Sequence, residues 1–69
     1  MSFKIWMHWA LVTLGVINEN EYLDDAFKIN DIIAAKQTPI STFLSVREDF
    51  ISYCHDVGAE PIWDVNWPF

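Results

Sequence analysis

The sequence has little glycine, cysteine and basic charge, and each shortage argues against a class of protein. Only two of its 69 residues are glycine, so there is no Gly-rich phosphate loop and an enzyme built on shaped loops is not expected. A single cysteine, Cys54, permits no internal disulfide and favours a reducing, cytoplasmic location. Four basic residues stand against ten acidic ones, and the net charge of −6 argues against direct binding to nucleic acid or to an anionic membrane.

The sequence also lacks a hydrophobic run of membrane-spanning length. The apolar run at residues 3–17 contains Lys4 and His8 and falls short of the roughly 20 residues that cross a bilayer. A secretory signal is not indicated either, since the basic start is weak and no small-residue cleavage site follows. We therefore expect residues 1–69 to form one small intracellular domain.

Apolar and aromatic residues are abundant instead, at 52% and 16% of the chain. A domain of this size has little interior, so these side chains fill an aromatic-rich core, form an apolar patch for a partner, or do both. Charge is uneven, because Lys4 is the only charged residue before Glu19 and acids dominate from there on. The sequence thus joins a neutral apolar start to an acidic remainder.

Residues 3–14 are predicted to form a mostly buried helix that ends at Gly15, where a left-handed conformation carries no Cβ penalty. The same stretch also alternates like a strand. This leaves an α+β alternative in which residues 3–9 and 62–68 pair. Asn18 is a predicted N-cap, and Glu21 is expected to reach back to its N–H in a capping box.

Residues 19–36 are predicted to form the second helix, because apolar side chains recur at helical spacing while acids crowd the first turn and Lys36 lies in the last. The stripe comprises Tyr22, Ala26, Ile29 and Ile33. Pro39 breaks this helix. A third helix then begins at about 39, with Thr38 as its cap, or at 46, and ends at Gly58. Its predicted stripe comprises Val46, Phe50, Tyr53, Cys54 and Val57.

The tail at residues 59–69 is a poor helix because it contains two prolines. Its aromatic residues alternate with polar ones, so an extended tail presents one apolar edge that must dock on something. The sequence therefore predicts an all-α domain of three helices with an extended aromatic tail packed on it.

Reactive combinations of residues are few. Cys54 and His55 are adjacent, but neighbours on a helix point about 100° apart, so Cys54 is interpreted as a core residue and His55 as a residue at the solvent edge. His8 has no ligand spacing with either of them. We expect no metal, no cofactor and no enzymatic activity.

The leading functional hypothesis is a small acidic module that binds another protein as an inhibitor or regulator. Very small acidic, aromatic-rich proteins are common among phage and mobile-element products that disarm host machinery. By that analogy of class, the partner is a nucleic-acid-handling protein with a basic surface, and the acids either imitate phosphates or only keep an apolar protein soluble. The alternative is a structural subunit that forms a homo-oligomer through the Trp6 and Trp9 segment or the tail. The predicted partner-binding residues are Glu19, Glu21, Asp24, Asp25, Asp31, Trp63, Trp67 and Phe69.

Overall fold

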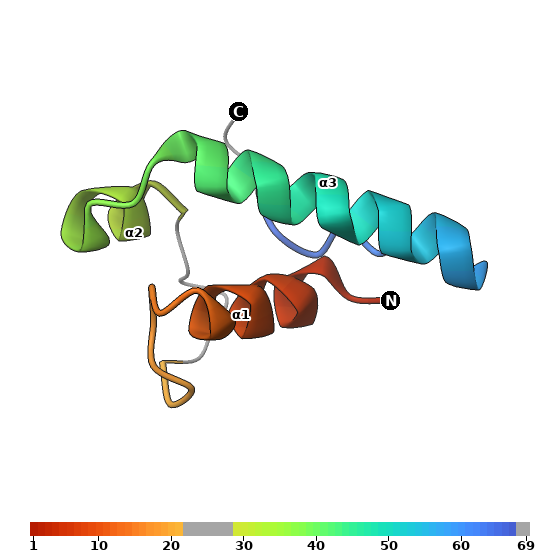
Figure 1. The fold of residues 1–69 in the computed structure, drawn as a ribbon, viewed down its shortest axis with the longest axis horizontal. Helices are drawn as coiled ribbons and strands as arrows, with labels where there is room; N and C mark the ends of the chain where they lie inside the picture. The colour runs from red at the N-terminus through yellow and green to blue at the C-terminus, as the bar shows by residue number, and fades with distance from the viewer. Residues whose placement is uncertain (22–28, 68–69) are drawn as a thin grey trace.

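Three helices make up the fold in the computed structural model, which describes residues 1–21 and 29–67: α1 (Phe3–Thr13), α2 (Ile29–Lys36) and α3 (Ile40–Val57). Helix α1 runs beside α3 in the opposite direction, and α2 lies near the start of α3 (Figure 1). The predicted all-α class is confirmed.

The α+β alternative is not needed. Within the described ranges, Ser2 and Ile62 form an isolated parallel bridge and no extended strand is present. The start of the chain and the tail do lie side by side, but the β-bridge between them involves only Ser2, which precedes α1, and Ile62. Helix α1 begins directly after that bridge, with Ser2 Oγ accepting the Ile5 N–H at 3.2 Å as an N-cap.

Helix α1 ends as predicted at Gly15, whose φ is +75°. The Gly15 N–H donates to the Val12 carbonyl, and the Val16 N–H donates to the Leu11 carbonyl at 2.9 Å. This pair of bonds is the Schellman arrangement that closes a helix end.

The second helix differs from its prediction at residues 19–21, which form a turn; α2 is described over Ile29–Lys36, and residues 22–28 lie outside the described residues. Tyr22 and Ala26, which were expected on its buried stripe, lie outside the described residues. The predicted bond from the Asn18 N–H to Glu21 is present at 3.0 Å, but it closes this turn. The hydrogen bond between Asn18 and Glu21 was thus predicted correctly, but residues 19–21 form a turn and not the first turn of a helix.

Helix α3 is the longer of the two predicted versions, with Pro39 in the N-cap position and Ile40 as its first residue. The helix starts one residue later than predicted, so the predicted cap, Thr38, does not occupy the N-cap position. The Thr38 side chain is buried instead. Gly58 stops it in the left-handed conformation, at φ +68°. Of the predicted apolar stripe, Tyr53 and Val57 are exposed instead of buried.

The core lies between α1 and α3, with α2 contributing Ile29. Its centre is aromatic: the Phe3 and Phe50 rings lie 5.1 Å apart, a separation typical of stabilising ring pairs. The buried apolar side chains are Phe3, Met7, Leu11, Ile17, Ile29, Phe43, Val46, Phe50 and Cys54.

The tail packs on this core, as predicted. The Ile62 N–H donates to the Met1 carbonyl at 2.8 Å, and the Phe3 N–H donates to the Ile62 carbonyl at 3.0 Å. The Asp64 carboxylate accepts the Ser2 hydroxyl and the Lys4 N–H, so it caps the start of α1 from another part of the chain. Burial raises the pKa of Asp64, but these hydrogen bonds outweigh it and hold the pKa below its ordinary value.

Candidate functional site

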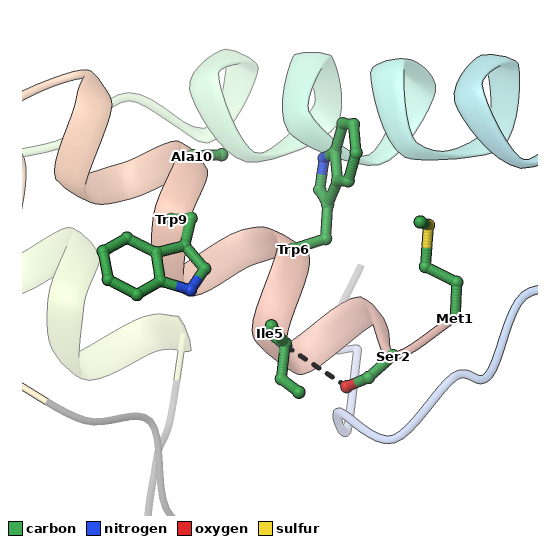
Figure 2. Close-up of a pocket in the computed structure, with 6 residues that line it drawn as sticks. All are labelled: Met1, Ser2, Ile5, Trp6, Trp9 and Ala10. Atoms are coloured by element: carbon green, nitrogen blue, oxygen red, sulfur yellow. Dashed lines mark hydrogen bonds between the residues drawn. The ribbon is translucent and has the colours of Figure 1, made fainter.

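The outward face of α1 carries an open apolar hollow of about 290 Å³. Ile5 and Trp9 are four residues apart in α1, so their side chains share one side of the helix, whereas Met1 precedes α1 and its sulfur lies 3.8 Å from that of Cys54 on α3. Figure 2 shows the Trp6 ring turned towards α3 while the Trp9 ring points away from it. The lining residues, here called the apolar hollow, are Met1, Ser2, Ile5, Trp6, Trp9 and Ala10.

The hollow is open to solvent at its most apolar positions. Ile5 is 61% exposed and Trp9 is 52% exposed, although neighbouring residues of the same helix are fully buried. Fully burying a side chain such as Ile5 stabilises the buried state by about 1.5–3 kcal/mol. An element that covers this face would therefore bind with a substantial hydrophobic contribution.

Trp6 gives the hollow a fixed wall. Its ring centroid lies 5.0 Å from that of Tyr53 and 5.7 Å from that of Phe50, so α3 holds the indole in place. A surface that is already formed loses little conformational freedom on binding. The arrangement suits the reception of apolar side chains.

The lining carries no ionisable side chain. The Ser2 hydroxyl donates to Asp64 and its oxygen accepts the Ile5 N–H, so it is already used in capping α1. A volume near 290 Å³ also falls at the lower end of the range for small-molecule pockets, about 300–1,000 Å³. The hollow therefore fits one or two side chains better than a cofactor.

Three acidic residues lie near the hollow, two on the face of α3 that holds Trp6 and one next to Met1. Asp49 and Asp56 lie four residues before and three residues after Tyr53, which places all three on one face of α3. Glu60 lies next to Met1, because the Met1 ammonium donates to its carbonyl at 2.8 Å. Asp49, Asp56 and Glu60 are all exposed, and they are here called the acidic rim.

The Lys and Arg side chains of α1 and α3 lie away from the hollow, whereas the Met1 ammonium lies beside it and His55 Nδ1 lies 3.8 Å from the Asp56 carboxylate. Lys4, the one basic residue of α1, is about 140–160° around the helix axis from Trp6 and Trp9. Arg47 packs on the tail, with its guanidinium carbon 5.2 Å from the Trp63 ring centroid and 5.8 Å from that of Trp67. The acidic rim therefore sets the local sign of charge.

Three of the predicted acidic binding residues lie in the described part of the chain, and one of the three is already paired. Glu19 and Asp31 are exposed, but Glu21 accepts the Asn18 N–H and pairs with Lys36 at 3.3 Å. These two partners, the Asn18 N–H first, hold the pKa of Glu21 below its ordinary value. The remaining predicted acids, Asp24 and Asp25, lie outside the described residues.

Two of the predicted aromatic binding residues, Trp63 and Trp67, pack on the core. Trp63 is 46% exposed, yet its ring lies 5.1 Å from Phe3 and 5.2 Å from Phe50. The Trp67 ring lies 5.7 Å from Phe3. Phe69 is outside the described residues. The described part of the tail thus covers Phe3 on the inner face of α1, and Trp63 still exposes part of its own surface.

Metal-ligating residues do not converge in the described part of the chain. Across residues 1–21 and 29–67, no three His, Cys, Asp or Glu side chains come together as a possible ion site. Cys54 is buried with its sulfur 3.8 Å from that of Met1, whereas the His55 side chain is 89% exposed. Both residues lie where the sequence placed them.

The hollow was only partly predicted. Trp6 and Trp9 were expected at a surface in the homo-oligomer alternative alone, and Met1 and Ile5 were not singled out. The signal was present in the uniform hydrophobicity of residues 3–14, since a helix that is apolar all round needs cover on every side.

Comparison with protein-family models, with curated proteins and with solved structures finds no match for this chain. Within the described residues, none of the helices is both long enough and apolar enough to cross a bilayer. Function therefore has to be argued from the surface of the molecule itself.

Proposed function

We propose that this protein is a small interaction module that inhibits or regulates another protein by binding it through the apolar hollow. The observation that carries the proposal is the exposure of Ile5 and Trp9, at 61% and 52%, beside a wall fixed by Trp6. Exposed apolar side chains gathered in one place are a common mark of a protein-binding surface. Tryptophan is also enriched among the residues that dominate binding energy.

The partner in this proposal has a basic surface, because the chain carries a net charge of −6. In its finer form the partner is a nucleic-acid-handling host protein, met by phage-type mimicry of phosphates. Glu19 and Asp31 are exposed and suit that role, whereas Glu21 is already paired with Lys36. The hollow supplies affinity and the acids supply steering.

A pull-down from the native host with mass spectrometry tests the proposal. The bait is the whole chain as wild type, as Ile5→Ser with Trp9→Ala, or as the matched control Ile40→Ser with Leu44→Ala. Ile40 and Leu44 are similarly exposed, at 48% and 45%, but lie at the start of α3. We expect a partner that the wild type and the control retain and the hollow variant loses.

The activity of the captured protein is then measured with and without the chain. Inhibition by the wild type and the control, but not by the hollow variant, supports a regulator that acts through this surface. Equal capture by all three baits would show that the hollow is not the binding site. Light scattering tests the homo-oligomer alternative: a stable dimer that the hollow variant disrupts, with no other partner, would favour a structural subunit.

A further inference from the structure

We infer that the occupant of the apolar hollow is a basic amphipathic helix of another protein, with apolar side chains in the hollow and Lys or Arg facing the acidic rim. This inference rests on the proposed function and names the class of partner. It is carried by the juxtaposition of the apolar hollow and the acidic rim, which the contact of Trp6 with Tyr53 and the hydrogen bond from the Met1 ammonium to the Glu60 carbonyl bring near one another.

The shape of the hollow favours a helix. Ile5 and Trp9 lie one turn apart on α1, and Trp6 and Ala10 repeat that spacing beside them. Apolar residues at i and i+4 of a second helix have a matching spacing, as in helix-in-groove recognition. The ring of Trp6, fixed against Tyr53, forms the wall towards α3.

The charges select which helix fits. Lys4 is turned away from Trp6 and Trp9, so α1 brings no cation to the groove apart from the Met1 ammonium, which the Glu60 carbonyl accepts at 2.8 Å. A partner helix therefore has an apolar strip against α1 and passes beside Asp49 and Asp56. Lys or Arg on that side of the partner is attracted to the rim, whereas Asp or Glu there is repelled.

The same rim argues against a second copy as the occupant. In a two-fold contact the same patch meets itself, so each copy brings its own Asp49, Asp56 and Glu60 towards the other. The chain as a whole adds a charge of −6 per copy. Like charges at a contact disfavour association, and an anionic lipid surface is disfavoured for the same reason.

A peptide display experiment tests the inference without knowledge of the natural partner. A library of amphipathic helical peptides has apolar residues at i, i+4 and i+7, with Lys, Glu, Gln and Ser randomised at the flanking positions. It is selected on the full wild-type chain and counter-selected on Trp9→Ala. We expect Lys to exceed Glu about threefold or more at the flanks on one side of the apolar strip.

The best selected peptide is then titrated by fluorescence anisotropy. Its dissociation constant is expected to rise about fivefold or more in Asp49→Asn with Asp56→Asn, and also when NaCl is raised from about 0.05 to 0.5 M. The control Asp31→Asn with Glu48→Gln removes the same number of charges from other surfaces and is expected to change the constant by less than about twofold.

Three results would overturn the inference. The first is a set of selected peptides with neutral or acidic flanks. These would still depend on Trp9, so the hollow would remain a binding surface and the proposed function would stand. The second is equal weakening by the rim and control variants. The third is a dimer seen by light scattering that Trp9→Ala abolishes, which would make a second copy the occupant. The proposed function itself fails if its partner binds regardless of Ile5 and Trp9, or if that dimer is the one complex the chain forms.

Discussion

The two faces of α1 are built from the same kinds of residue but have different surroundings. Phe3, Met7 and Leu11 are at most 1% exposed, whereas Ile5 and Trp9 each expose more than half of their surface, at 61% and 52%. The tail and α3 cover the first face and leave the second open. Most side chains of α1 are apolar, but the described tail and α3 cover only one of its two faces.

Removing the tail is expected to destabilise the packed face of α1 more than any single substitution would. Truncation after Pro61 takes away the Trp63 ring beside Phe3 and the Asp64 cap on α1, so both faces of α1 become exposed. A domain of this size has little stability to lose, and we expect the cooperative unfolding transition to disappear. Thermal denaturation followed by circular dichroism measures it. A truncated chain that melts like the wild type would show that the tail is no part of the core.

A matched pair of substitutions two residues apart tests the faces directly. Phe3→Ala leaves a cavity between α1 and α3 and is expected to lower the free energy of unfolding by about 3–5 kcal/mol. Ile5→Ala removes an exposed side chain and is expected to change it by no more than about 0.5 kcal/mol. Urea denaturation gives both values. Similar losses from the two variants would mean that the outer face is also buried within the monomer.

The sequence predicts the parts of this fold that depend on local chemistry. The left-handed glycines Gly15 and Gly58 end α1 and α3, and Glu21 reaches the Asn18 N–H. Each depends only on residues within one or two turns, which the sequence displays directly. The predicted helix from residue 19 was wrong for residues 19–21, since the same bonds that begin a helix also close an isolated turn.

The candidate site depends on contacts between distant parts of the chain, which the sequence does not display. Trp9 and Trp63 are both aromatic residues in apolar segments, and nothing local distinguishes an interface from a core position. The difference between the two tryptophans comes from a distant contact: the Asp64 carboxylate accepts the N–H of Lys4, 60 residues away, and so holds the tail against α1. That contact decides which face of α1 the tail covers and which face remains for a partner.

Asp64 therefore offers a smaller, more specific test of the packed face. Asp64→Asn keeps the size of the side chain but removes the charge that accepts the Ser2 hydroxyl and the Lys4 N–H. The loss of a charged cap is expected to lower the free energy of unfolding by about 1 kcal/mol near neutral pH. Urea denaturation at several pH values checks the size and the sign.

The pH dependence of this cap follows from the direction of the pKa shift. The pKa of Asp64 is lower in the folded chain than its ordinary value, so the cap stabilises fully above that ordinary value. Its contribution declines as the pH falls through the folded pKa. The wild type should thus lose more stability than Asp64→Asn on acidification. Equal acid sensitivity of the two chains would contradict the role given to this carboxylate.

The ion pair between Glu21 and Lys36 provides the smallest expected effect, because both side chains face solvent and an exposed pair contributes little to stability. The Asn18 N–H is the main cause of the lowered pKa of Glu21, and Lys36 adds to it. In Lys36→Gln we expect this pKa to rise but to stay below its ordinary value, since the Asn18 N–H still donates. An NMR titration measures it, and high salt should shift the wild type in the same direction as the substitution. A full return to the ordinary value would mean that Lys36 holds the turn closed, so that this exposed contact organises the chain as Asp64 does.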